Sequence, residues 1–331
     1  MPKFLILRFS SIGDIVLTTP VIRCLKAQLP DAEVHYLTRK SFAPVLENNP
    51  YIDSLHLFDE SPFECHDKLN DGAFEAVIDL HHNQRTFFVK RWLKKPRLGI
   101  FSFKKLNVEK WLLVNFKIDR MPDVHIVDRY MQTVSSLGVK NDGKGLDYFI
   151  TDKDRTILNK IPATHRSDYV AVAIGAQHTT KRLPTDKLIG ICKEIKRPVL
   201  LLGGNGDLAA SKEIERESGN HVRSLCGELS LNESAAVVEG ARVVLTHDTG
   251  LMHIASAFKK PIVSVWGNTV PQFGMTPYYG SASVTNRIFE VSGLSCRPCT
   301  KIGFDNCPKG HFNCMGKQDS DSIINTVNTL K

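Results

Sequence analysis

Residues able to do chemistry stand at positions 246–250, between an apolar run and a helical pattern. The run at 243–245 is apolar and β-branched, as in a buried parallel strand, and apolar residues at helical spacing follow the polar residues. A second apolar run occupies residues 261–266. The order is therefore strand, polar loop, helix and strand, and open α/β sheets bind ligands at loops of this kind.

The residue types of this loop suit an anionic ligand. Asp248 or Thr249 is placed to cap the helix, and Gly250 allows the backbone to turn tightly and approach a ligand. The free N–H groups of such a helix start can hold an anion such as a pyrophosphate, although a capped helix without a ligand has the same pattern. His253 follows Thr249 by one helical turn, and spacing alone favours an ordinary surface histidine there.

A second polar loop, at residues 9–14, joins the first apolar run to the first helical pattern. Its small residues, among them Ser11 and Gly13, can bring backbone N–H groups towards a ligand. The loop lacks the G-x-G-x-x-G fingerprint, which argues against a dinucleotide-dependent dehydrogenase. Asp14 is either an acid favoured by the helix dipole or a general base, and spacing alone favours the first explanation.

Cations and a further acid occupy corresponding loops of the second half. Lys181 and Arg182 follow two threonines and precede a helix, an arrangement that suits phosphate oxygens as well as it suits a solvated pair of charges. Asp207 ends a glycine-rich loop that could admit a ribose or be only a tight turn. Neither Asp-x-Asp pair, at 152–154 and 319–321, follows a buried strand, so no catalytic metal is assigned to them.

Four of the eight cysteines cluster near the C-terminus. Cys296, Cys299, Cys307 and Cys314 lie on a predicted loop and could form a tetrahedral Zn or Fe site. The irregular spacing favours the alternative, a loop with free thiols. A metal here would be structural, since four thiolates leave no open coordination position.

Apolar runs and helical patterns alternate along the whole chain, which predicts an α/β fold with two Rossmann-like domains facing one another across a cleft. We expect a first domain at 1–160, a second at 161–318, and a C-terminal helix at 319–331 that packs back on the first. Pro20 should disturb the first helix, expected at 14–29, and Gly138 should end the one expected at 125–137. The expected strands are 3–9, 33–37, 54–58, 74–80, 97–100, 169–174, 198–202, 222–225, 243–245 and 261–266.

Composition and charge narrow the possible partners. The 331 residues are 42% hydrophobic and 24% charged, with a formal net charge of +8. No nucleic-acid-binding motif accompanies this charge, which also fits an anionic substrate or an anionic membrane surface. Residues 90–117, rich in Lys, Arg, Phe, Trp and Leu, could touch lipid headgroups, although an amphipathic helix packed on its own domain is favoured. Without a secretion signal, we expect a cytoplasmic protein with reduced cysteines.

Three stretches together resemble glycosyltransferase family 9, the ADP-heptose:lipopolysaccharide heptosyltransferases. They are LRFSSIGDIVLTTP at 7–20, HDTGLMHIA at 247–255, and the cysteine pattern at 296–315. The resemblance implies a GT-B fold, with an acceptor-binding first domain and a nucleotide-sugar-binding second domain. It implies inverting transfer of a heptose or related sugar from an ADP-sugar to a lipid-linked saccharide, with no metal needed, at the inner face of the inner membrane.

The resemblance also implies a role for each motif residue. Asp14 would be the general base, and Ser11 and Gly13 would lie in the substrate site. Lys181 would steady the leaving ADP, Asp248 would contact sugar hydroxyls, and the diphosphate would meet Thr249, Gly250 and His253. Asp207 and the backbone at Leu229 would be placed for ribose and adenine. Two alternatives remain: an autotransporter-type protein heptosyltransferase, whose cysteines hold iron, and a nucleotide-sugar-binding protein without turnover.

Overall fold

The computed structural model describes residues 1–330 and divides into two compact domains. The first domain comprises Met1–Lys105, Val124–Phe149 and Gly280–Ala282. The second domain comprises Leu106–Asp123, Ile150–Tyr279 and residues 283–330. The main division therefore falls at Phe149, earlier than the expected boundary at residue 160, and a helical segment from the first half of the chain belongs to the second domain.

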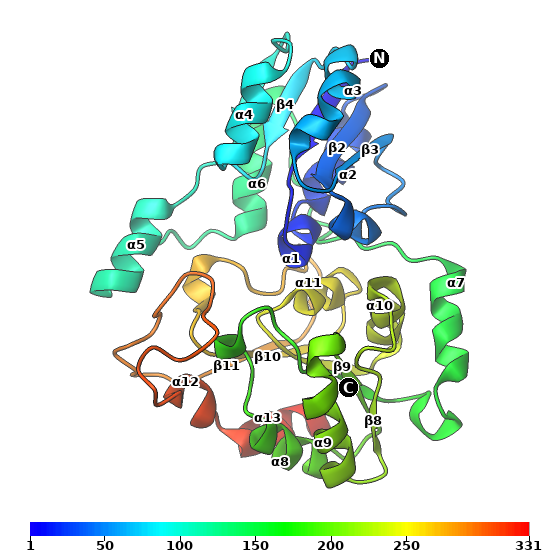
Figure 1. Ribbon diagram of the computed structural model, residues 1–331, viewed down its shortest axis with the longest axis vertical. Coiled ribbons are helices and arrows are strands. Elements are labelled where there is room, and N and C mark those ends of the chain that lie inside the picture. The colour runs from blue at the N-terminus through cyan, green and yellow to red at the C-terminus, as the bar shows by residue number, and fades with distance from the viewer. Residues whose placement is uncertain (331) are drawn as a thin grey trace. The chain divides into compact units, whose positions relative to one another are not determined.

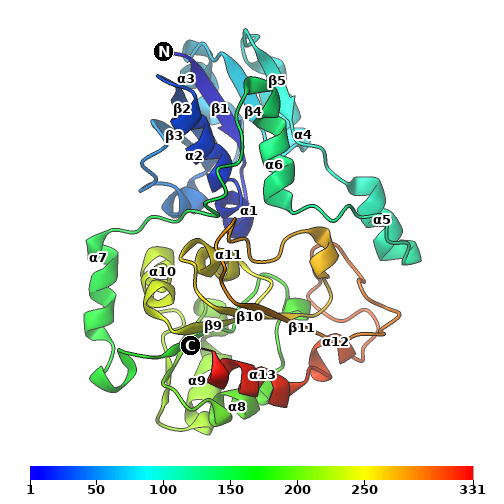
Figure 2. The ribbon, with the colours of Figure 1, turned by 180° about the vertical axis from the view of Figure 1, so that it is seen from behind.

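A five-stranded parallel sheet forms the centre of the first domain, with the strand order β3-β2-β1-β4-β5. Helices α2 and α6 contact each other on one face of the sheet (Figure 2), and α3 and α4 lie on the other (Figure 1). The strands are β1 (Lys3–Leu7), β2 (Glu33–Arg39), β3 (Ser54–Phe58), β4 (Ala76–Asp79) and β5 (Gly99–Ser102). The helices are α1 (Ile12–Val16), α2 (Thr19–Gln28), α3 (His66–Asp71), α4 (Gln84–Trp92) and α6 (Ile126–Val134).

The first helical segment is interrupted, as its proline predicts. The expected single helix at 14–29 is two helices, α1 and α2, and Pro20 lies in the first turn of α2. A proline is tolerated there because the first helical N–H groups have no partner within the helix. Gly138 adopts φ 82° and ends the helical segment that begins with α6, as expected of a C-cap glycine.

The second domain contains a six-stranded parallel sheet with the order β11-β10-β9-β6-β7-β8. Its strands are β6 (Val170–Ala173), β7 (Val199–Leu202), β8 (Val222–Ser224), β9 (Val243–His247), β10 (Ile262–Trp266) and β11 (Asn286–Glu290). Its helices are α5 (Asn107–Phe116), α7 (Asp152–Arg155), α8 (Thr185–Glu194), α9 (Leu208–Ser218), α10 (Leu231–Gly240), α11 (Gly250–Ala257), α12 (Asn313–Gly316) and α13 (Ser320–Thr329). The sequence analysis did not predict β11, α3 or α12.

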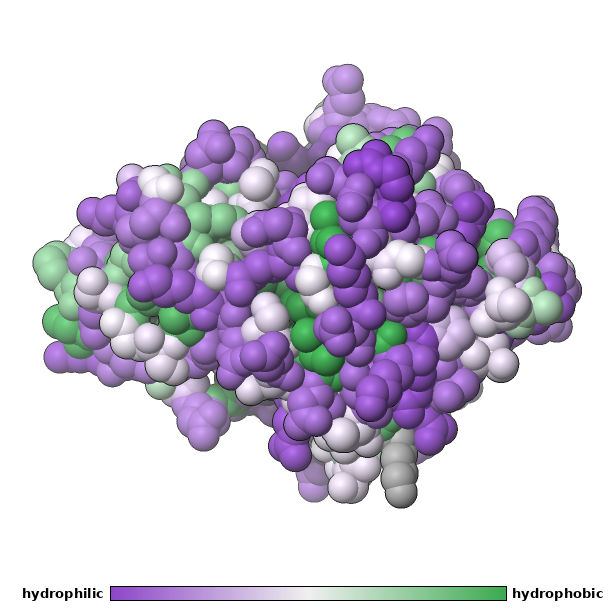
Figure 3. Space-filling view, turned by 90° about the horizontal axis from the view of Figure 1, so that it is seen from below, coloured by the Kyte–Doolittle hydropathy of each residue, from purple (hydrophilic) through white to green (hydrophobic). Residues whose placement is uncertain are grey.

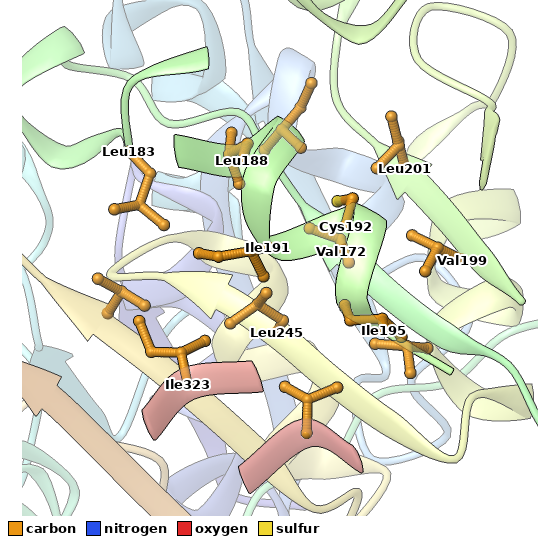
Figure 4. Close-up of a cluster of buried hydrophobic side chains, with 14 of the residues drawn as sticks. Val172, Leu183, Leu188, Ile191, Cys192, Ile195, Val199, Leu201, Leu245 and Ile323 are labelled. Carbon is orange, nitrogen blue, oxygen red and sulfur yellow. The ribbon is translucent and has the colours of Figure 1, made fainter. Parts of the chain in front are cut away.

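A core of aliphatic side chains lies between this sheet and helices α8 and α13 (Figure 4). Leu188, Ile191 and Cys192 of α8 meet Val172 and Leu245 of the strands there. Both faces of a parallel sheet are covered by helices, so its strands are nearly continuous apolar runs. This is why most of the strands could be located in the sequence.

The last helix completes the core of the second domain. Ile323 and Val327 of α13 are fully buried in that core, and Asn328 accepts a hydrogen bond from the backbone N–H of Lys196 at 2.9 Å. The expectation that this helix packs back on the first domain is therefore wrong. The amphipathic pattern of α13 predicts a buried face but does not identify the domain that buries it.

Each sheet changes its direction of growth once. In the first domain the chain runs from β1 to β2 and β3, then crosses to β4 on the other side of β1. In the second it runs from β6 to β7 and β8, then crosses to β9 beside β6. Ligands of open α/β sheets bind beyond the carboxyl ends of the strands at such switch points. We therefore look for functional side chains between β1 and β4, and between β6 and β9.

The surface is predominantly polar on the face that Figure 3 shows, with hydrophobic residues in small separate areas. Among residues 1–330, no helix is long and apolar enough to cross a membrane. Exposed aromatic side chains lie on a helix of each domain: Phe87 and Phe88 on α4 of the first, and Trp111 and Phe116 on α5 of the second, are more than half exposed.

Replacing Ile323 by alanine tests the placement of α13. We expect the free energy of unfolding to fall by about 2–4 kcal/mol, because the substitution leaves a cavity in a close-packed core. Ile302→Ala is the matched control, since Ile302 is 58% exposed and should change stability by less than about 0.5 kcal/mol. Urea unfolding followed by tryptophan fluorescence measures both. Equal midpoints for the two variants would contradict this packing.

Candidate active site

Asp14 lies at the switch point of the first sheet, in an ion pair with Arg8. The Asp14 Oδ1 atom is 2.7 Å from Nη2 of Arg8, and its Oδ2 accepts a hydrogen bond from the Ser11 hydroxyl at 2.8 Å. A weaker bond from the Ser11 backbone N–H also reaches Oδ2, at 3.3 Å. The Asp14 side chain keeps 24% of its surface exposed, whereas that of Arg8 keeps 9%. The carboxylate is thus held by a cation behind it and remains accessible to a ligand.

Arg8 is fixed by neighbours from both sides of the switch point. It donates to the carbonyl oxygens of Ser10 and Leu80, at 2.8 and 2.7 Å, and to the hydroxyl of Tyr130 at 3.1 Å. Burial is the largest single effect and lowers the pKa of the guanidinium, but the charge of Asp14 together with Tyr130 and Tyr36 outweighs it and the pKa is raised. Burial also raises the pKa of Tyr130 to about 12, so that its hydroxyl stays neutral.

His81 holds the start of the Asp14 loop from the neighbouring strand. Its Nδ1 accepts the backbone N–H of Phe9 at 3.0 Å, which requires the unprotonated nitrogen. Burial, followed by the charge of Arg8, lowers the pKa of His81 to about 3. The imidazole is therefore neutral and acts as an acceptor. The sequence analysis did not single out Arg8 or His81, although a lone cation ending an apolar strand was a signal for Arg8.

In the second domain, Lys181 and Asp248 meet at the switch point between β6 and β9. The Lys181 Nζ atom is 2.5 Å from Asp248 Oδ2, and the Thr269 hydroxyl donates to the same oxygen at 2.9 Å. The side chains of Lys181 and Asp248 are 16% and 12% exposed. The geometry repeats that of the first domain: a carboxylate is held by one cation and one hydroxyl. Thr269, after β10, was missed because nothing local marks it.

His247 positions the chain just after Lys181. Its Nε2 accepts the backbone N–H of Leu183 at 3.0 Å, and the residue is almost completely buried. Burial, with a smaller effect from the charge of Arg182, lowers the pKa of His247 to about 4. A neutral imidazole at the end of β9 therefore supports the loop that follows β6. The structure assigns to His247 a supporting function that the sequence analysis did not anticipate.

Arg182 and Asp207 form an ion pair with each other. Arg182 Nη1 is 2.7 Å from Asp207 Oδ1, and Oδ2 accepts the backbone N–H of Gly204 at 2.9 Å. A Cβ atom at Gly175 would lie 2.3 Å from Asp207 Oδ2, and one at Gly203 would lie 2.8 Å from it. Both glycines are thus needed for the close approach of this carboxylate. The pair ties together the loops that follow β6 and β7.

The remaining predicted residues lie on the loops expected of them. Thr249 is the N-cap residue of α11, with an extended backbone, while the Asp248 carboxylate points to Lys181 instead of capping the helix. Gly250 begins α11, and Leu229 is half-buried just before α10. His253 is 2% exposed, so the expectation of a surface histidine is wrong. In the first domain Gly13 is buried within α1.

Cys296, Cys299 and Cys307 lie on a loop, whereas Cys314 lies in α12. We call the segment 296–314 the cysteine loop. All eight cysteines are free thiols. Within residues 1–330, no three His, Cys, Asp or Glu side chains are arranged to hold a metal ion. Burial raises the pKa of Cys314 to about 11 and also raises that of Cys299, so that both are protonated thiols when no metal is bound. The structural metal at these four cysteines stays a prediction.

The depressed pKa of His247 predicts a pH dependence of stability. Between about pH 6.5 and about pH 4 the unfolded chain binds a proton at this residue and the folded chain does not. The free energy of unfolding should therefore fall as the pH falls through this window, by on the order of 3 kcal/mol from this group. NMR titration of the His247 ring checks the cause. A midpoint near 6.5 would contradict the assigned environment.

Comparisons with known proteins identify the family. The family model of "Glycosyltransferase family 9 (heptosyltransferase)" matches residues 63–304. The chain is 25% identical over 309 residues to lipopolysaccharide heptosyltransferase 1 of Campylobacter coli, covering 86% of this chain and 87% of that protein. A glycosyltransferase family 9 structure from Veillonella parvula superposes with a TM-score of 0.78 at 21% identity, covering 99% and 97% of the two chains. E. coli heptosyltransferase WaaC, solved with ADP, gives 0.69 at 19% identity, covering 99% and 100%.

The structural likeness confirms the predicted GT-B class, with two Rossmann-like α/β domains. The match of the family model extends over more than half of the chain and includes the Lys181, Asp248 and Thr269 cluster. The chain belongs to glycosyltransferase family 9 and is a glycosyltransferase.

Proposed function

We propose that this enzyme transfers a heptose from ADP-heptose to a saccharide of the lipopolysaccharide core, with inversion at the anomeric carbon. The observation that carries the proposal is the Lys181–Asp248 pair at the switch point of the second sheet, at 2.5 Å. The names of the relatives support the donor and acceptor: several are lipopolysaccharide heptosyltransferases, and one solved relative contains ADP.

The second domain would bind the donor through complementary charges. Lys181 would neutralise the diphosphate as the ADP leaves, so that no divalent metal is required at this step. The N-terminus of α11, at Thr249 and Gly250, would offer N–H groups to the same phosphates, with His253 one turn further on. Asp248 would accept hydrogen bonds from sugar hydroxyls. This set brings cationic and N–H groups to the place where negative charge develops.

The adenosine would lie towards β7 and β8. Leu229, half-buried before α10, offers apolar surface and backbone groups for adenine. The role that we propose for Asp207 is narrower than ribose binding, because Arg182 and the Gly204 N–H already occupy its carboxylate oxygens. Asp207 would shape the loop, which leaves backbone groups of the loop to face the ribose.

Asp14 would be the general base in the first domain, with Ser11 and Gly13 beside the acceptor. Displacement at an anomeric carbon passes through an oxocarbenium-like state, and an acceptor hydroxyl becomes a better nucleophile as it loses its proton. The Asp14 side chain is partly exposed and its Oδ2 is fixed by Ser11, so the carboxylate can accept this proton without reorienting. The proton passes to the carboxylate as the new glycosidic bond forms and the bond to ADP breaks.

Two substitutions separate binding from chemistry. Asp14→Asn should lower kcat by about 10²–10⁴-fold, since it removes the base, and should leave ADP affinity unchanged. Lys181→Ala should weaken ADP binding by about tenfold or more, because a charge-assisted contact to phosphate is lost. Calorimetric titration with ADP and a transfer assay with ADP-heptose measure both effects, with and without a chelator.

Lys187→Ala is the control for the loss of a lysine, because Lys187 on α8 donates to the Gln318 carbonyl and the Ser320 hydroxyl instead of to the Lys181–Asp248–Thr269 cluster. Normal turnover by the Asp14 variant would exclude it as the base. A preference for UDP or GDP over ADP would overturn the donor, and inhibition by the chelator would overturn the metal-free step. Metal analysis of the purified chain tests for a structural Zn or Fe at the cysteine loop.

The same proposal places the enzyme in the cytoplasm, in peripheral contact with an anionic membrane that carries its lipid-linked acceptor. Residues 90–117 contain nine Lys and Arg residues and one acid, Glu109. Helix α5 within this segment packs Leu113 against Val270 and Phe273 and leaves Trp111 and Phe116 outward, 55% and 58% exposed. An amphipathic helix with outward aromatic side chains, within a basic segment, has the composition of a membrane-surface contact.

Sedimentation with lipid vesicles tests the membrane contact. The double variant Trp111→Ala/Phe116→Ala should bind vesicles with anionic headgroups about tenfold more weakly than the native chain, because the apolar part of the contact is lost. Phe63→Ala removes an aromatic side chain of similar exposure, 62%, outside the segment and should bind normally. Equal binding of the double variant and the native chain, or equal binding to neutral and anionic vesicles, would contradict the proposal.

A further inference from the structure

The cysteine loop contacts two of the three loops that supply the Lys181–Asp248–Thr269 cluster, the loop after β6 and the loop after β10. Its most buried charged side chain, Arg297, is 7% exposed and lies between Cys296 and Cys299. Arg297 reaches away from its own loop to the segment that follows β10, residues 266–269. The hydrogen bonds of this buried arginine indicate its role.

Every nitrogen of the Arg297 guanidinium has a partner. Nε donates to the carbonyl of Gly267, Nη2 to that of Thr269 at 3.0 Å, and Nη1 to that of Val291 at 2.9 Å. Nη2 also lies 3.0 Å from the Glu290 carboxylate. The planar fork thereby fixes the backbone of Gly267 and Thr269 relative to β11. A lysine has the charge but not the fork, so it cannot satisfy the same carbonyls.

Thr269 passes this restraint to the acid of the cluster. Its carbonyl is held by Arg297, and its hydroxyl donates to Asp248 Oδ2 at 2.9 Å. Lys181 Nζ contacts the same oxygen. Because the hydroxyl can reach Asp248 only while the backbone of Thr269 stays in place, Arg297 acts on the carboxylate through one intervening residue.

A second contact of the cysteine loop holds the chain before Lys181. The Phe304 carbonyl accepts hydrogen bonds from the backbone N–H and the hydroxyl of Thr180, at 3.1 and 2.9 Å, and the Phe304 N–H donates to that hydroxyl at 2.8 Å. Gly303 packs so closely that a Cβ atom there would lie 2.5 Å from His178. Lys181 follows directly, so the cysteine loop restrains both partners of the ion pair.

The two restrained segments also touch each other. A Cβ atom at Gly267 would lie 2.9 Å from the carbonyl oxygen of Thr180 and 2.7 Å from the Met315 side chain. The chain after β10, the chain before Lys181 and α12, which directly follows the cysteine loop at Met315, therefore form one packed unit. Displacement of any of them would change the distance between Lys181 and Asp248.

We propose that Arg297 is a positioning residue for sugar transfer, which holds Thr269 and hence Asp248 in register with Lys181, and that the cysteine loop is the element that carries it. This rests on the donor site assigned under the proposed function. Small misplacement of groups around a reacting centre costs rate steeply, by about a hundredfold for 1 Å. The cysteine loop is thus a part of the donor site that contributes no group to the ligand.

A double-mutant cycle in the full chain tests this positioning. Arg297→Lys and Thr269→Val should each lower kcat/KM for ADP-heptose by about tenfold, and the double variant should fall no further than the worse single variant, because both break the same path. The loss should be divided between kcat and the KM for the donor, with the KM for the acceptor unchanged. Arg155→Lys is the control. Arg155 on α7 forms a comparable ion pair with Glu239 on α10, and this variant should leave activity unchanged.

Glu290→Gln provides a milder variant in case Arg297→Lys does not fold, since Glu290 is 31% exposed and contacts Arg297 from the solvent side. It should shift kcat/KM in the same direction by a smaller factor. Additive losses in the cycle, or native kcat/KM in folded Arg297→Lys and Glu290→Gln, would overturn the proposal. ADP affinity is measured in parallel. A native chain that binds ADP but transfers no heptose would overturn the proposed function. Weaker ADP binding by Arg297→Lys would still support the positioning proposal.

Discussion

The ion pair of Lys181 with Asp248 depends on a constraint of parallel sheets. The carboxyl ends of all strands lie at the same edge of such a sheet. Only at the switch point do the loops that follow two neighbouring strands run to opposite faces of the sheet. Lys181 lies in the loop after β6 and Asp248 is the first residue after β9, and these strands are neighbours only because the chain crosses the sheet after β8. The geometry of the site is thus set by strand order before any side chain is chosen.

The first domain holds its carboxylate in a similar way, with different residues. Arg8 and Ser11 hold Asp14 as Lys181 and Thr269 hold Asp248, so that each carboxylate has one cation and one hydroxyl. The cation is nearly buried in the first pair, where the tyrosine hydroxyl and two carbonyls fix it. Such a cation cannot follow a ligand, which suits the general base that we propose Asp14 to be. Lys181, on a loop, is placed to meet an anion.

Most strands could be predicted from the sequence, but not the side chains that link the loops between them. Buried parallel strands are recognisable because they are apolar throughout, whereas the edge strand β11 is mostly exposed and was missed. Asp14, Lys181 and Asp248 stood out by type and place, and the family resemblance gave them roles. Thr269, His247 and Arg297 escaped because each acts through a contact far along the chain. The amphipathic pattern of α13 was visible, but only packing shows which core it enters.

The first domain is not a continuous stretch of chain. Gly280–Ala282 returns to it after the second sheet has been built as far as β10, and the Ser281 N–H donates to the carbonyl of Gly143 at 2.7 Å. A ribosome therefore releases the last part of the first domain only after most of the second has been synthesised. The first domain stays incomplete during that interval. A truncation before residue 280 would remove part of both domains at once rather than leave one intact.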